Sequence, residues 1–172
     1  MRLCFPESEL RPLAKLYRCD ETETALLAER KAIRTQGFLT REQLERVAKW
    51  KSPRRADATR KNSDEFIRET TTFALGANDE RARIEPLTLL DGVMWPTASA
   101  ILHLYHREKY PILDFRALES VSSAVPTNYD FPFWWSYVQF TRKIAERNRV
   151  DMRTLDRALW QYSKQNLRPR AK

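Results

Sequence analysis

Apolar positions along the chain recur every three or four residues, the spacing that places them on one face of an α-helix. No segment shows the strict alternation of apolar and polar residues that is typical of a half-buried β-strand. The pattern therefore predicts an all-α fold, a compact helical domain of about seven or eight helices. The predicted helices span 6–18, 20–37, 40–50, 62–77, 96–107, 115–124, 131–148 and 151–165.

Residues that favour helix ends flank several of these segments. Asp20 is placed to cap the helix that follows it, and Gly37 is placed to end that helix in a left-handed conformation. Thr40 and Gln43 have the spacing of a capping box. Pro12 interrupts the first segment, which makes that helix the weakest of the set.

Length and composition agree with this fold class. The chain has 172 residues but only three glycines, and it is rich in Leu, Ala, Glu, Arg and Lys. A chain of this length can bury a sizeable core without disulfides or metals, and it suits one domain, residues 1–172. We find no internal repeat and no low-complexity tract.

The net charge of +8 adds a candidate partner. Such an excess of Lys and Arg favours a polyanion, most simply nucleic acid. The alternative is a protein that happens to be basic without binding any polyanion.

Cysteine content and hydropathy limit the remaining possibilities. Cys4 and Cys19 are too few for a disulfide framework, a four-ligand zinc site or an iron–sulfur cluster, so we expect no metal and no cofactor. The first residues lack the apolar run of a signal peptide, and no stretch has the length and hydropathy of a membrane span. We expect no membrane association and an intracellular, cytoplasmic location, with nucleoid association if the source is bacterial. The oligomeric state is left open.

The segment LLDGVMWPTASAIL, residues 89–102, has the pattern of a helix-hairpin-helix. Such a motif needs a helix end, a glycine turn and small residues that open the second helix. Gly92 can adopt a positive φ, Val93 can pack inward, and Thr97, Ala98 and Ser99 allow close helix packing. The turn and the N-terminus of the second helix would present backbone N–H groups to a DNA phosphate without reading its sequence.

An aspartate follows the hairpin in an apolar setting. Asp114 lies in YPILDFRAL, eighteen positions after Pro96. A buried carboxylate costs several kcal/mol unless it is paired or used. The alternative is a structural role, in which Asp114 caps the helix that begins at Phe115. Capping is compatible with a functional role for the same carboxylate.

Together the two motifs resemble the helix-hairpin-helix DNA glycosylase superfamily, which includes endonuclease III and the adenine-mismatch glycosylases. The resemblance covers about thirty residues, and YPILDFRAL is especially similar to the aspartate segment of adenine-mismatch glycosylases. It implies that Asp114 is catalytic and that the hairpin holds double-stranded DNA. Met94 stands where the family has a second glycine, and Pro96 stands where members with lyase activity have a lysine. The resemblance therefore implies a monofunctional glycosylase that hydrolyses the N-glycosidic bond of a flipped base.

The chemistry of base removal is consistent with an aspartate in that place. Cleavage of the bond between base and sugar develops positive charge at C1′, and a fixed carboxylate can stabilise that charge or activate water. The target base must first leave the stack and enter a pocket.

Further residues are candidates for the same DNA site. The hairpin would contribute Gly92, Val93, Met94, Trp95 and Thr97 to DNA binding, and other cationic contacts would come from Lys51, Arg54, Arg55 and Arg116. Base-pocket candidates are Trp50, Ser52 and Trp134. For Trp50 the alternative is a core tryptophan at a solvated helix end, and for Trp134 it is a place in the aromatic core.

Two other functions remain open at this point. A non-catalytic helix-hairpin-helix module would bind nucleic acid but would release no base. An interaction protein would use its aromatic C-terminal helices to bind another protein and would not bind nucleic acid even at low salt.

Overall fold

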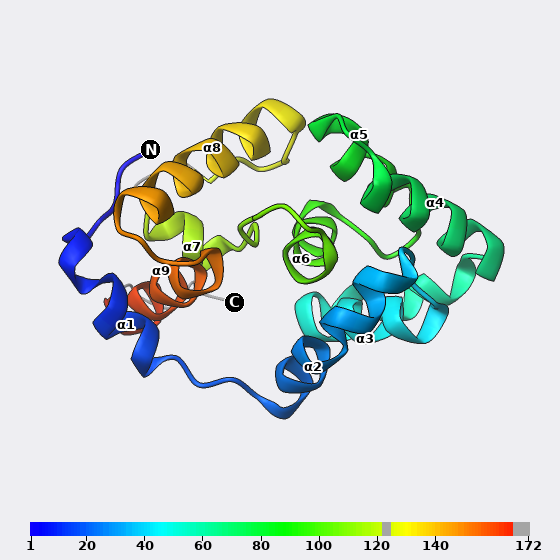
Figure 1. Ribbon diagram of the computed structural model, residues 1–172, viewed down its shortest axis with the longest axis horizontal. Helices are drawn as coiled ribbons and strands as arrows, with labels where there is room; N and C mark the ends of the chain where they lie inside the picture. The colour runs from blue at the N-terminus through cyan, green and yellow to red at the C-terminus, as the bar shows by residue number, and fades with distance from the viewer. Residues whose placement is uncertain (122–124, 167–172) are drawn as a thin grey trace. The chain divides into compact units, whose positions relative to one another are not determined.

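The computed structural model describes residues 1–121 and 125–166 (Figure 1). This part of the chain contains nine α-helices, three 3-10 helices and no strand, so the all-α prediction is confirmed, with slightly more helices than expected. None of these helices combines the length and apolar content needed to cross a membrane. The contacts divide the chain into two units: unit 1 is formed by 1–18 and 111–172, and unit 2 by 19–110.

Unit 1 is built from two stretches far apart in sequence. Its elements are η1 (Glu7–Glu9), α1 (Leu10–Leu16), α7 (Phe115–Glu119), α8 (Phe131–Arg147) and α9 (Met152–Asn166). Pro12 is accommodated because it lies in the first turn of α1, where a helix needs no N–H donor. Helix α9 packs against α1, α7 and α8. The helix predicted over 115–124 ends at Glu119, and its residues 122–124 lie outside the described part.

The N-terminal residues of unit 1 are tied to its C-terminal half by hydrogen bonds. Arg2 N–H donates to Val121 O at 3.2 Å, and Cys4 N–H donates to Ser120 O at 2.9 Å. The Tyr162 hydroxyl donates to the carbonyl of Cys4 at 3.0 Å. These bonds fix residues 2–4 onto α7 and α9.

Unit 2 is arranged around one buried helix, α6. Its elements are α2 (Glu21–Gln36), α3 (Arg41–Lys51), η2 (Pro53–Lys61), α4 (Asp64–Gly76), α5 (Glu80–Ile84), η3 (Pro86–Leu89) and α6 (Trp95–Tyr105). Every residue of α6 from Thr97 to Tyr105 is buried, and α2, α3 and α5 pack against it. The predicted caps are observed: Asp20 and Thr40 accept N–H groups of the first turns of α2 and α3, and Gly37 ends α2 at φ 79°.

A part-buried network of hydrogen bonds joins α5 to Tyr110, the residue that ends unit 2. Arg83 Nη1 donates to the Tyr110 hydroxyl at 2.7 Å, and that hydroxyl donates to Glu80. Burial and the bond to Glu80 raise the pKa of Tyr110 from 10.0 to about 12, although Arg83 acts in the opposite direction. Burial alone would lower the pKa of Arg83. The bond to Tyr110 and the charges of Glu80 and Glu108 outweigh burial, so the pKa of Arg83 is raised.

The raised pKa of Tyr110 predicts a loss of stability in alkaline solution. The unfolded chain releases this proton near pH 10, whereas the folded protein retains it up to about pH 12. The unfolded state therefore binds fewer protons in this interval, and the free energy of unfolding falls as the pH rises through it. Urea unfolding from about pH 9 to about pH 12 should show this decline, and the decline should be shallower in Tyr110→Phe. Equal slopes for the two proteins would contradict the prediction.

Candidate nucleic-acid interface and candidate catalytic aspartate

The residues singled out in the sequence fall into both units. Unit 2 contains Trp50, Lys51, Ser52, Arg54, Arg55 and the hairpin residues Gly92–Thr97, whereas unit 1 contains Asp114, Arg116 and Trp134. Each set has its own geometry within its unit.

The hairpin turn has the expected backbone. Gly92 adopts φ 82°, and Val93 N–H closes the turn onto Leu90 O at 3.0 Å. The Val93 side chain is buried, so Val93 shapes the turn and has no exposed side chain to offer a DNA strand. Met94, in contrast, is exposed at the N-cap of α6, and Pro96 lies in the first turn of that helix.

The turn lies directly against the basic segment η2. A Cβ atom added to Gly92 would lie 2.8 Å from Arg55 O and 2.9 Å from both the N and the Cγ2 atoms of Thr59. Real Cβ atoms do not approach backbone atoms this closely. Glycine is therefore required at position 92 for its positive φ and for the close approach of η2.

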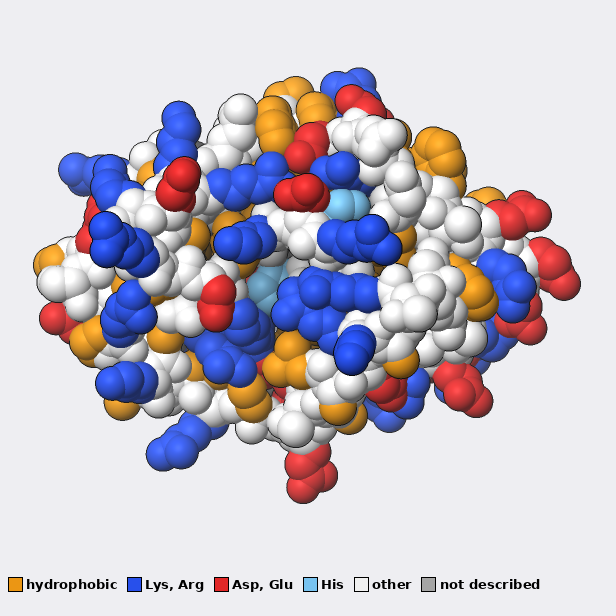
Figure 2. Space-filling view, viewed as in Figure 1, with side chains coloured by type: hydrophobic (Ala, Val, Ile, Leu, Met, Phe, Trp, Pro, Cys, Tyr) orange, Lys and Arg blue, Asp and Glu red, His pale blue; other side chains and the backbone are white. Residues whose placement is uncertain are grey.

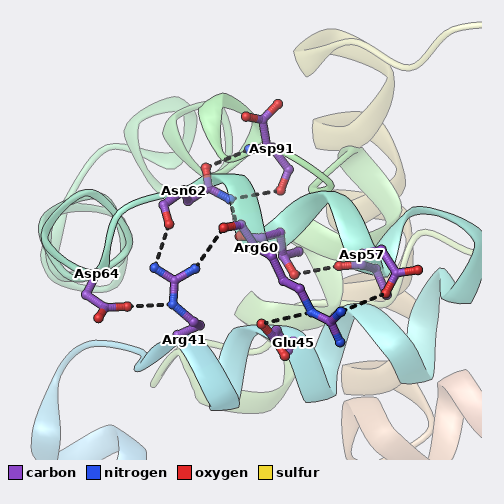
Figure 3. A network of polar contacts seen from close by, with 9 residues as sticks. Arg41, Glu45, Asp57, Arg60, Asn62, Asp64 and Asp91 are labelled. Carbon is purple, nitrogen blue, oxygen red and sulfur yellow. Dashed lines mark hydrogen bonds and ion pairs between the residues drawn. The ribbon is translucent and has the colours of Figure 1, made fainter.

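Asn62 holds the hairpin turn to η2 (Figure 3). Its side chain accepts from Asp91 N–H at 2.9 Å and donates to Asp91 O at 3.1 Å. Arg41 in turn fixes this end of η2, because its guanidinium donates to Arg60 O, Asn62 O and Asp64 Oδ1. The sequence analysis missed Asn62 and Arg41, since partners 29 and 21 positions apart show no local spacing pattern.

A second contact joins the hairpin helix to the end of α3. The Thr97 hydroxyl donates to Ser52 Oγ at 3.1 Å, and Thr97 itself is buried. Trp50 and Lys51 lie in the last turn of α3 and are half-buried. The structure thus brings the hairpin together with Ser52 and Arg55, as a single DNA site in unit 2 requires.

Several donors and cations beside the turn are not used within the protein. Among the described residues, no hydrogen-bond acceptor meets the backbone N–H of Gly92 or Met94. Arg54 and Arg55 are exposed, and within the described part of the chain no carboxylate lies within 4.0 Å of either. Figure 2 shows many Lys and Arg side chains on the surface of the protein. This combination is suited to a phosphate backbone.

Asp114 caps α7, as the alternative interpretation expected. Its Oδ1 accepts from Arg116 N–H at 2.9 Å, and its side chain is half-buried. The preceding residues are anchored to α9, because Ile112 N–H donates to both carboxylate oxygens of the buried Asp156 at 3.2 Å. The carboxylate at position 114 is therefore held in place from both sides.

A buried tyrosine lies near these two carboxylates. Tyr137 of α8 has no exposed surface, and its hydroxyl has no hydrogen-bond partner among the described residues. Burial, followed by the negative charges of Asp156 and Asp114, raises the pKa of Tyr137 well above its ordinary value. The sequence analysis had singled out neither Tyr137 nor Asp156 as a functional residue.

The other two candidates of unit 1 differ in accessibility. Arg116 is half-buried, and its guanidinium lies over the rings of Phe115 at 5.2 Å and Trp160 at 5.5 Å. Trp134 is fully buried, with Phe131 and Trp135 beside it. It has no free face on which a base could stack, so its burial supports the alternative that Trp134 is a core residue.

The two histidines have structural partners. His103 Nδ1 lies 2.6 Å from Tyr110 O, and His106 Nδ1 accepts from Glu108 N–H at 2.9 Å. Over 1–121 and 125–166, no three His, Cys, Asp or Glu side chains are grouped so that they could hold a metal ion.

Comparison with known proteins found no relative of this chain. No protein family, no curated protein and no solved structure matches this chain.

Proposed function

We propose that this protein binds double-stranded DNA through the hairpin of unit 2 and hydrolyses an N-glycosidic bond with Asp114. One observation supports the DNA-binding part above all: the Gly92 turn is packed against η2, which carries Arg54 and Arg55. Backbone donors and unpaired cations then lie in one place, and together they can bind a phosphate backbone without reading base sequence.

The catalytic part rests on Asp114 and on the resemblance of its segment to DNA glycosylases. Asp114 is held by its bond to Arg116 N–H and by the anchoring of Ile112 to Asp156. A carboxylate fixed in this way can stabilise positive charge at C1′ and help to activate water. Pro96 has no amine with which to form a Schiff base, so the proposed reaction releases the base and leaves the DNA strand intact.

DNA binding can be tested through its dependence on salt. The affinity for a DNA duplex should fall steeply as salt rises, and the Arg54→Gln, Arg55→Gln double variant should lower the log–log slope by about 1.8. A matched control, Lys31→Gln with Lys109→Gln, removes the same charge from exposed positions of unit 2 and should leave the slope nearly unchanged. Equal slopes for the two double variants would contradict a site at η2.

Base release can be tested with a panel of duplexes that carry damaged or modified bases. The wild-type protein should release at least one base, and Asp114→Asn should reduce the rate by at least about a hundredfold, because an amide stabilises positive charge poorly. Equal rates would eliminate the catalytic role of Asp114. Binding without any release would favour the non-catalytic module, and failure to bind nucleic acid at low salt would favour an interaction protein.

A further inference from the structure

Unit 2 contains a pocket of about 460 Å³ at the C-terminal end of α6, the end opposite to the hairpin. A pocket of this size is in the range of small-ligand sites. All of its lining residues belong to unit 2. Those that can contact a polar ligand include Arg34, Arg83, Arg107, Thr72 and Asn78.

Three arginines and one acid, Glu108, line this pocket, and one of the arginines is already engaged. Arg83 donates through Nε to Ala77 O at 2.8 Å and through Nη1 to Tyr110, and it lies 3.5 Å from Glu80. The charge of Glu108 also acts on Arg83. Arg83 is therefore part of the framework of unit 2.

Arg34 and Arg107 have no such engagement. No carboxylate of the described residues lies within 4.0 Å of either guanidinium. The one described hydrogen bond of Arg34 runs from Nη2 to His106 O at 2.6 Å, and Arg107 is exposed. Burial and the neighbouring Arg30 lower the pKa of Arg34, which is the direction expected for a cation without a counter-charge.

Arg34 also has a buried donor without an acceptor. Its Nε is buried and has no hydrogen-bond partner among the described residues. Buried donors are nearly always paired in native proteins, so the guanidinium of Arg34 is less fully satisfied than that of Arg83.

We propose that this pocket binds a small phosphate ester of about the size of a mononucleotide. A terminal phosphate has three strong acceptor oxygens, more than a carboxylate, and the donors of Arg34, Arg107 and Thr72 can share them. The volume leaves room for an organic group beside Leu75 and the ring of His106.

The C-terminal helix ends at the pocket do not reverse its preference for an anion. Helices α2, α4 and α6 all end here, and their free carbonyl groups favour cations. Arg34 and Arg83 already meet the carbonyls of His106 and Ala77. The charge of Arg107 and the remaining donors of Arg34 are left for an anion.

Calorimetric titration of the full chain with adenosine 5′-monophosphate tests the proposal. We expect saturable binding at or below about 1 mM, competition by inorganic phosphate and no binding of adenosine. Arg107→Gln, at an exposed position, should weaken binding about tenfold through the loss of a charge-assisted hydrogen bond. Arg34→Lys, which keeps the charge but removes the guanidinium donors, should weaken it by a smaller factor.

Arg54→Gln provides a crossed control, because it removes the same charge at the proposed DNA site. It should weaken DNA binding and leave nucleotide binding intact, whereas Arg107→Gln should do the reverse. No binding of the nucleotide or of phosphate at about 10 mM would overturn the proposal, and so would binding that both pocket variants leave unchanged. Neither result bears on DNA binding, so the two proposals can fail separately.

Discussion

Gly92→Ala is expected to destabilise the protein by about 3 kcal/mol and to abolish tight DNA binding. Alanine at φ 82° costs about 1–2 kcal/mol, and its Cβ would meet Arg55 O at 2.8 Å. Backbone atoms cannot move aside as a flexible side chain can, so η2 and the hairpin must separate. Urea unfolding measures the loss of stability, and duplex binding at low salt measures the loss of function.

The other two glycines separate the causes of this effect. Gly37 has φ 79° but no atom within 4 Å of an added Cβ, so Gly37→Ala should cost only about 1 kcal/mol of backbone strain. Gly76 has neither a positive φ nor a close neighbour, and Gly76→Ala in α4 should be neutral or stabilising by up to about 1 kcal/mol. If Gly92→Ala costs no more than Gly37→Ala, the close packing of the turn on η2 is refuted.

Asn62→Ala should cost about 3 kcal/mol, because it removes the side chain that holds Asp91 from both sides. The Asp91 N–H loses its described acceptor, and Thr59 O loses the bond that Asn62 Nδ2 donates at 2.8 Å. Chemical unfolding checks the size of the loss, and hydrogen exchange at Asp91 should accelerate. Exposed Asn128 provides the control, since Asn128→Ala should change stability by less than about 0.5 kcal/mol.

A variant that keeps only the accepting oxygen of the Asn62 side chain tests whether the donating amide is needed to hold the turn. Asn62→Asp retains an acceptor for Asp91 N–H but replaces the donating amide with a second acceptor, which would face Asp91 O and Thr59 O. Because the new carboxylate and these carbonyl oxygens repel one another, Asn62→Asp should be no more stable than Asn62→Ala. It should also fail to restore slow hydrogen exchange at Asp91. Wild-type stability in Asn62→Asp would show that the amide donor does not hold the turn.

The local features of the fold were predictable because their causes lie within a few residues. The capping box of Thr40 and Gln43, the caps Asp20 and Asp114 and the left-handed Gly37 each depend on a partner no more than four residues away. The burial of Val93 was predictable as well, since the pattern of the hairpin itself requires it.

Features that join distant parts of the chain could not be predicted in this way. No spacing in the sequence links Asn62 to Asp91 or Ile112 to Asp156, because either partner could pair with many other groups. No feature of the sequence marks the boundaries at which the contacts divide the chain into two units. For Trp134 the sequence offered both a base pocket and the aromatic core, and the packing of α8 shows that it is buried.

The bonds from residues 2–4 to Ser120, Val121 and Tyr162 limit when this segment can reach its native position during synthesis. Residues 1–18 are synthesised before residues 19–110, but they find their partners only after α7 and α9 have been translated. Residues 19–110 meet no such delay, and they can fold while the rest is still being made. Residues 1–18 therefore reach their native place later than unit 2 can, and until then Leu10 and Leu13 lack the partners that bury them.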